Sequence, residues 1–365
     1  MKILIPTNFD IEYCDYFSGK AGEEIAFYGR MPKDEIGSIF DIFLKNGFSA
    51  DITRIKKFIE HIKPRGIKFY YLMDAVCLDN CEVQRKPHHK IIDTVTKIVN
   101  AGADGFIVSS PMLMQMIKSH FPQAQVIVSP GLRIDSFQAA ASTAKEGADG
   151  IIYSFFVNRD LEFLDMALSE FNNIDNYIYL NNGCCLKSIY CVRHLAELSH
   201  FSQNFIKHEM PKKDYGGLLC AREKIKHPEK HLSAAYLTPS DINFFRGKFP
   251  GLNYFLSDAD GTFESVKLVF DAYFRQKTPD NLFSIIKNYL CLGSLKFDSL
   301  KLDISKASEI MNNQLAVKNS CSYIDCAKCR KCFDFFSRNA VFDQTEQTKL
   351  LKELDDEINS TIKLG

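Results

Sequence analysis

Two groups of cysteines in the second half of the chain are the residues best suited to chemistry. The first group consists of Cys184, Cys185, Cys191 and Cys220. The second group consists of Cys321, Cys326, Cys329 and Cys332. Thiolates are soft metal ligands, and cysteines this close along loops can point at one centre. Both groups therefore predict bound zinc or an iron–sulfur cluster.

The first group follows an Asn-Asn-Gly sequence, which permits a tight turn that presents two adjacent thiols. Residues 189–198 have a helical pattern, and the amides at the start of a helix favour an anionic sulfur at Cys191. Cys220 follows a Gly-Gly turn and can close the site. We predict Cys185, Cys191 and Cys220 as metal ligands. We also include Cys184 among the predicted cofactor-binding residues. Of the two adjacent cysteines, Cys184 is the one better suited to core packing.

The second group has the spacing Cys-x4-Cys-x2-Cys-x2-Cys. Two consecutive x2 spacings are typical of ferredoxin-like ligand runs and also of some zinc sites. All four cysteines are therefore predicted metal ligands. Two alternatives stay open for them: a purely structural zinc site, and one centre shared with the first group.

Three further side chains are predicted to act in catalysis. Arg30 and Arg133 each follow an expected strand, and a guanidinium there can hold a carboxylate or a phosphate. His194 lies one helical turn after Cys191, where an imidazole can supply a ligand or move protons. The alternative for each is structural: a salt bridge for the arginines and a satisfied buried imidazole for His194.

The elements that must position these residues follow a repeated strand–helix pattern. Eight strands are expected, at 2–6, 25–29, 67–73, 105–109, 125–129, 150–154, 176–180 and 252–256. Helical patterns lie between them, as at 54–62, 90–100, 111–120, 136–146 and 161–171. This alternation predicts the α/β class and a (β/α)8 barrel of the TIM type. In such a barrel the carboxyl ends of the strands carry the active site, and the first cysteine group follows the seventh strand.

The pattern changes near residue 260. We predict a barrel domain over 1–260 and a helical, cysteine-rich extension over 261–365 that carries the second cysteine group. Helices are expected at 262–276, 279–290, 305–315 and 345–363, with a polar connector at 293–303. The extension has to fold back if its cysteines are to reach the barrel mouth.

Composition limits the classes of protein and partner. The 365 residues are 46% hydrophobic and 25% charged, which predicts a folded core. The 45 basic and 45 acidic side chains balance, so a general nucleic-acid groove is not favoured. No apolar run has signal-peptide or membrane-spanning length, which predicts a cytoplasmic protein without a membrane partner. In that reducing compartment cysteines favour metals over disulfides.

The cysteine segments resemble the collagenase-like peptidase family U32, in its iron–sulfur subgroup. The resemblance extends roughly over residues 1–335. It is carried by the pair Cys184-Cys185, the segment Cys191-Val192-Arg193-His194 and the pair Ser199-His200. Residues 237–242 and 325–332 are similar to two further segments of the family. The resemblance implies a barrel-like fold and a 4Fe–4S cluster held by four cysteines. It also implies oxygen-independent hydroxylation of small molecules or RNA bases, and in some relatives a heterodimer partner of the same family.

The predicted function is an iron–sulfur-dependent enzyme that hydroxylates or otherwise redox-modifies a small molecule, a peptide or an RNA base. The chain lacks the family's glutamate-rich signature near the cysteines, which weakens the case for an RNA substrate. One alternative is a metal-dependent peptidase of the U32 type, although the chain contains no HExxH motif. The other is a non-enzymatic binding or assembly protein, with structural zinc at the second cysteine group.

Overall fold

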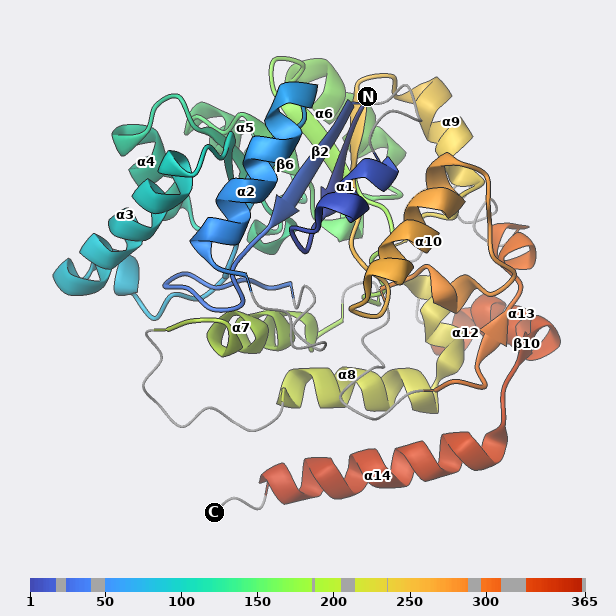
Figure 1. Ribbon diagram of the computed structural model, residues 1–365. Coiled ribbons are helices and arrows are strands. Elements are labelled where there is room, and N and C mark those ends of the chain that lie inside the picture. The colour runs from blue at the N-terminus through green and yellow to red at the C-terminus, as the bar shows by residue number, and fades with distance from the viewer. Residues whose placement is uncertain are drawn as a thin grey trace.

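Eight parallel strands close into one barrel, as the sequence predicts (Figure 1). The computed structural model describes residues 1–17, 24–40, 50–185, 188–204, 214–234, 236–287, 297–309 and 326–362. The strands are β1 (Lys2–Pro6), β2 (Glu24–Gly29), β3 (Lys68–Met73), β4 (Gly105–Val108), β5 (Gln125–Val128), β6 (Gly150–Ile152), β7 (Asp175–Tyr179) and β8 (Leu252–Phe255). Each strand pairs with the next along the chain, and β8 closes the barrel against β1 with Ile3 opposite Tyr254.

The barrel interior is filled by side chains. Parallel strands covered on both faces are apolar throughout, and every residue of β4 is buried. Near the carboxyl ends, the ring of Phe255 stacks on Tyr28 at 4.6 Å and meets the edge of Tyr179 at 5.1 Å. These aromatic contacts make a solid floor beneath the barrel mouth.

Helices cover the outside of the barrel between successive strands (Figure 1). They are α1 (Ile11–Phe17), α2 (Ile52–Ile62), α3 (Arg85–Asn100), α4 (Pro111–His120), α5 (Phe137–Lys145), α6 (Leu161–Glu170), α9 (Asp241–Lys248) and α10 (Phe263–Phe274). Ser110, Ser136 and Thr262 cap α4, α5 and α10 by accepting a hydrogen bond from a first-turn amide. α10 packs on α1 through Tyr13 and Phe263, whose ring centroids lie 4.4 Å apart.

A separate layer of helices lies at the mouth of the barrel, beyond the carboxyl ends of the strands (Figure 1). It contains α7 (Cys191–Phe201), α8 (Tyr215–Lys226), the 3-10 helix η6 (Pro228–Ser233) and the C-terminal α14 (Gln344–Ile362). α8 packs between α7 and α14. Leu350, Leu354 and Ile358 form the buried stripe of α14. The chain thus returns at its end to cover the helix that carries Cys220.

The remaining extension differs in part from expectation. The predicted helix at 279–290 is wrong over its described part, where only a 3-10 turn, η7 (Leu282–Ser284), forms; residues 288–290 lie outside the described ranges. The predicted connector contains β9 (Lys301–Leu302), which pairs with β10 (Ala340–Val341). Residues 304–309 are helical, as predicted for 305–315, and the rest of that segment is not described. α12 (Cys326–Cys329) and α13 (Lys331–Asn339) follow.

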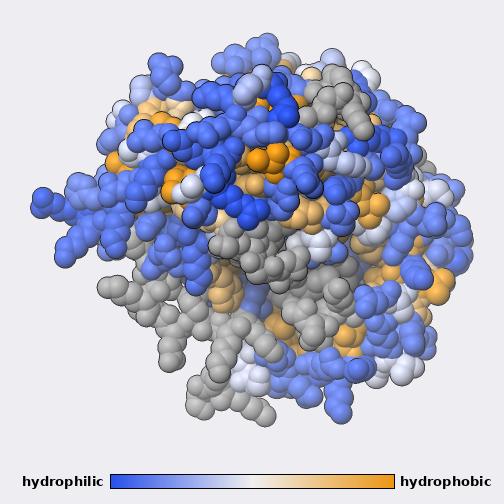
Figure 2. Space-filling view, in the orientation of Figure 1, coloured by the Kyte–Doolittle hydropathy of each residue, from blue (hydrophilic) through white to orange (hydrophobic). Residues whose placement is uncertain are grey.

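The outer surface is mainly hydrophilic on the face shown in Figure 2, with apolar residues in small patches. Among the helices of the described ranges, none is both long and apolar enough to cross a bilayer.

Candidate functional site

The loop after β7 is held rigidly by its two asparagines. The side chain of Asn181 donates to the carbonyl oxygens of Ser257 and Ile285, at 2.9 and 3.1 Å, and accepts from the amide of Ser257. The side chain of Asn182 accepts from the amide of Cys184 at 2.7 Å. A side chain at Gly183 would place its Cβ 2.1 Å from the carbonyl oxygen of Lys287, so only glycine fits there.

This loop brings Cys184 against Cys191, the first residue of α7. Both side chains are buried, and the thiol of Cys184 donates a hydrogen bond to the sulfur of Cys191. That bond raises the pKa of Cys184 well above its usual value, and burial adds to the effect. The same bond lowers the pKa of Cys191 against the effect of burial, and the charge of Arg133 lowers it further. Cys191 is therefore the more readily ionised thiol of the pair.

Helix α8 supplies Cys220 and, one turn later, Lys224. The ammonium of Lys224 is buried and donates to the carbonyl oxygen of Gly183 at 2.6 Å. Burial opposes its charge, but the thiols of all four cysteines of the first group outweigh that effect and raise the pKa of Lys224. Lys224 is thus a buried cation within the electrostatic reach of four sulfurs. Lys224 was not predicted from the sequence, although a lysine four residues after a cysteine on a helix shares its face.

Cys185 faces the segment η6. Its sulfur lies 3.7 Å from the carbonyl oxygen of Lys230, and its backbone bridges to Ala234. Burial raises the pKa of Cys185 to about 11. His231, which the sequence analysis also missed, is buried in η6 with its ring 5.0 Å from Phe283. Burial and the charge of Lys224 hold the pKa of His231 well below its usual value, so the imidazole is neutral.

His194 clamps α7 to α8. Its Nδ1 pairs with the carboxylate of Asp214, and both side chains are buried. The carboxylate of Glu197 accepts from the amide of Gly216 at 2.8 Å and strengthens the same junction. Burial works against ionisation of Asp214, but the hydrogen bond from His194 prevails and lowers its pKa. The observed contacts of His194 are thus structural, and its role in proton transfer stays a prediction.

The two predicted arginines lie near opposite ends of α7. Arg133 has a left-handed backbone (φ 58°), and its guanidinium lies over the ring of Phe156 at 5.3 Å, within electrostatic reach of Cys191. Arg30 is 5% exposed, pairs with Asp34 at 3.1 Å and donates to the carbonyl oxygen of Ser202, just past the helix. Its Nε and Nη1 find no hydrogen-bond partner among the described residues. An eleven-residue helix is about 16 Å long, so the two guanidinium groups lie in different parts of the site.

The second cysteine group can be placed only in part. Cys321 lies outside the described residues, and Cys326 begins α12 without a described side chain. The side chains of Cys329 and Cys332 are partly exposed. α13 packs against η6, the same segment that contacts Cys185, so the extension does fold back toward the first group. Metal ligation by these four cysteines stays a prediction.

The donor set of the first group decides which metal centre it can hold. Cys184, Cys185, Cys191 and Cys220 are free thiols. No three cysteine, histidine or acidic side chains among the described residues converge on the position of a single metal ion. A 4Fe–4S cluster binds each of its four thiolates through a different iron, which spreads the sulfurs more widely. Two buried and two half-buried thiols with nearby cations fit that group in donor chemistry, whereas a mononuclear zinc site does not fit.

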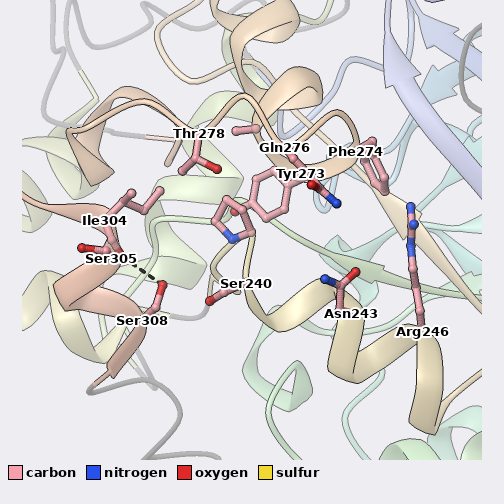
Figure 3. A pocket seen from close by; sticks show the side chains of 12 residues that line it. Ser240, Asn243, Arg246, Tyr273, Phe274, Gln276, Thr278, Ile304, Ser305 and Ser308 are labelled. Atoms are coloured by element: carbon pink, nitrogen blue, oxygen red, sulfur yellow. Dashed lines mark hydrogen bonds between the residues drawn. The ribbon is translucent and has the colours of Figure 1, made fainter.

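A separate pocket of about 330 Å³ lies between α9, the end of α10 and residues 304–308 (Figure 3). Its lining is mostly uncharged, with Ser240, Asn243, Thr278 and Ser308 labelled around the opening and Arg246 at one side. Figure 1 places α9 at the opposite end of the molecule from α8. This pocket holds no thiol or carboxylate and is not the candidate centre.

Comparisons with known proteins bear on this geometry. Residues 44–167 match the model of peptidase family U32. An uncharacterized protease of Methanocaldococcus jannaschii, MJ1657, is 21% identical over 285 residues, which cover 78% of this chain and 81% of that protein. Over residues 44–167 the chain is thus similar to peptidase family U32. The structure of the U32 peptidase Mk0906 superposes with a TM-score of 0.50 and 14% identity, over 71% of this chain and 92% of that one.

The predicted U32 resemblance and barrel fold are confirmed by these matches. The names of these two proteins, protease and peptidase, agree better with the predicted U32 peptidase alternative than with an iron–sulfur redox enzyme. The U32 match ends before the four cysteines of the first group, so it assigns them no role.

Proposed function

We propose that this chain is an enzyme of the U32 type whose reactive centre is the first cysteine group. The observation that carries the proposal is that the buried ammonium of Lys224, which binds the carbonyl oxygen of Gly183, lies within electrostatic reach of Cys184, Cys185, Cys191 and Cys220. A set of buried thiols with a cation among them suits an anionic, multi-iron cluster. The reaction that we infer is a redox modification of a small molecule or a peptide.

Different residues of the chain would have different roles at this centre. The four cysteines would hold a 4Fe–4S cluster, which supplies one-electron redox chemistry when bound. Arg133 lies beside Cys191 and can hold an anionic group of the substrate through its guanidinium. The aromatic floor formed by Tyr28, Tyr179 and Phe255 excludes water from below. The mouth of the barrel is the side from which substrate enters.

An optical experiment tests this proposal. Protein isolated without oxygen should be brown and should bleach when dithionite is added. Cys191→Ser should remove the colour, whereas Cys77→Ser, at a partly exposed thiol outside the group, should retain it. Colourless wild-type protein that contains zinc alone would favour the non-enzymatic, zinc-stapled alternative.

The second candidate is a metal-dependent peptidase, because the names of both matched relatives say so. A panel of unstructured peptides separates the two functions. Cleavage that chelators abolish but that persists in protein stripped of iron would establish the peptidase. Absence of cleavage in a protein that holds iron and sulfide would leave the redox enzyme.

A further inference from the structure

We propose that the pocket between α9, the end of α10 and residues 304–308 is a binding site for a neutral sugar. Its volume of about 330 Å³ is near the lower end of the range for small-molecule sites, which suits a single sugar ring. None of the residues that line it belongs to the first cysteine group. The inference therefore does not depend on the proposed function.

Three side chains at the pocket offer hydrogen bonds that the described part of the chain does not use. Asn243 lies on α9, and Gln276 and Thr278 follow α10; Figure 3 shows Asn243 and Gln276 on facing walls of the pocket. All three are exposed, and none has a side-chain hydrogen-bond partner among the described residues. Carboxamides and hydroxyls both donate and accept, so they match the hydroxyls of a sugar.

The backbone of Gln276 is strained. It has a φ of 56°, in the left-handed region that a residue with a Cβ seldom adopts. Strain of this kind is found most often where a residue takes part in binding or catalysis. Since Gln276 lines the pocket, its unusual backbone supports a ligand site at this place.

Two serines on the remaining wall can only accept hydrogen bonds from a ligand. The hydroxyl of Ser308 donates to the carbonyl oxygen of Ile304 at 2.9 Å, and that of Ser305 donates to the carboxylate of Asp303 at 2.5 Å. Each hydroxyl has a single hydrogen, so its oxygen is left as an acceptor. The ligand must therefore supply donors, which a sugar does and a carboxylate does not.

Apolar side chains complete the lining. Tyr273, Phe274 and Ile304 lie beside the polar residues (Figure 3). The hydroxyl of Tyr273 donates to the carbonyl oxygen of Leu237 at 2.6 Å, so only its ring is left to face a ligand. The C–H face of a sugar ring can pack against these side chains because both surfaces are apolar.

The lining suits a sugar better than an acid or a peptide. Of the described residues that line the pocket, only Arg246 is charged, and its guanidinium lies over the ring of Phe274 at 5.6 Å. These lining residues belong to helices and loops, so they offer no strand edge along which an extended peptide could pair.

Two variants and one control test the pocket. The double variant of Asn243→Ala and Thr278→Val removes a carboxamide and a hydroxyl; alanine favours the helix more than asparagine, and valine keeps the shape of threonine. Ser308→Phe places a ring in the cavity. The control is Asn173→Ala, at an exposed asparagine outside the pocket. Circular dichroism establishes that each variant is folded.

Calorimetric titration of the full chain with glucose, galactose, mannose and N-acetylglucosamine measures binding. We expect saturable binding of at least one sugar, with a Kd that added sodium chloride leaves unchanged. The Kd should rise about tenfold in the double variant, because each lost hydrogen bond weakens binding severalfold. It should stay unchanged in Asn173→Ala, and Ser308→Phe should not bind.

Four outcomes would overturn the inference. The first is that folded wild-type protein binds none of the four sugars. The second is an equal Kd in the wild type and the double variant, whether or not Ser308→Phe folds. The third is tighter binding of glucose 6-phosphate than of glucose, weakened by salt, which would make this an anion site. The fourth is binding of unstructured peptides without any binding of sugar. The iron and sulfide content, which tests the proposed function, is unaffected by all four.

Discussion

The thiol of Cys184 donates a hydrogen bond to the sulfur of Cys191, although one residue lies in the loop after β7 and the other begins α7. The bond fixes which of the two sulfurs ionises first. It also ties the end of a barrel strand to the helical layer over the mouth. This one contact therefore affects both the reactivity of the two thiols and the packing of the site.

Cys191 should be the most reactive thiol of the first group near neutral pH. Its pKa is lowered by the hydrogen bond from Cys184, whereas burial raises the pKa of Cys185 to about 11. As the pH falls from 9 to 7, alkylation should therefore decline less at Cys191 than at Cys185. Peptide-resolved mass spectrometry of metal-free protein measures both rates. Cys184→Ala should slow the reaction at Cys191, and faster alkylation of Cys185 than of Cys191 would contradict this assignment.

The pair of His194 and Asp214 should contribute strongly to stability. Asp214→Ala leaves a buried imidazole without its carboxylate and should cost about 3 kcal/mol in the free energy of unfolding. The matched control is Asp355→Ala, which breaks a half-exposed pair with Arg222 and should cost less than about 1 kcal/mol. Urea unfolding compares the two variants. Equal losses would mean that His194 does not clamp α7 to α8.

Gly37 should tolerate no side chain. It has a left-handed backbone (φ 81°), and an added Cβ would lie 2.7 Å from the carbonyl oxygen of Ser199 in α7. Gly37→Ala should cost about 3 kcal/mol, from backbone strain and overpacking together. Gly66→Ala is the control, since Gly66 is also left-handed (φ 71°) but has open space, and should cost about 1 kcal/mol. Similar melting temperatures for the two variants would show that α7 is not seated on this loop.

Asp74 should make stability depend on pH. Burial raises its pKa to about 6, against hydrogen bonds from Ser129 and Ser38. A carboxyl with a raised folded-state pKa stabilises the fold below its unfolded pKa near 4, and this contribution is lost as the pH rises through 6. The loss is on the order of 3 kcal/mol. Asp74→Asn should therefore flatten the decline in the free energy of unfolding between pH 4 and pH 7, and parallel curves would refute the assignment.

The barrel was predictable because its signal is local. Each strand is a short apolar run between turn signals, and the predicted bounds differ from the observed ones by at most two residues. Gly102 and Gly147 both end helices in the left-handed region with φ 97°, where glycine is favoured. β9 was missed because a two-residue strand has no pattern of its own and forms only through pairing with β10.

The cysteines of the site could be predicted from the sequence, but the charged side chains around them could not. The first cysteine group can be recognised from its residue type and from its place after the seventh strand. Lys224 is one lysine among many, and only the docking of α8 buries it beside the thiols. His194 was expected to move protons, but its observed partner Asp214 lies beyond a segment whose path no local pattern predicts.

The amount of iron and acid-labile sulfide per chain, in protein isolated without oxygen, tests the central claim most directly. We expect about four of each, from one cluster with four cysteine ligands. Both should be lost in Cys191→Ser and in Cys220→Ser, and both should be retained in Cys77→Ser. Iron and sulfide that survive in the double variant of Cys191 and Cys220, or that are absent from the wild type, would contradict the assignment of the first cysteine group.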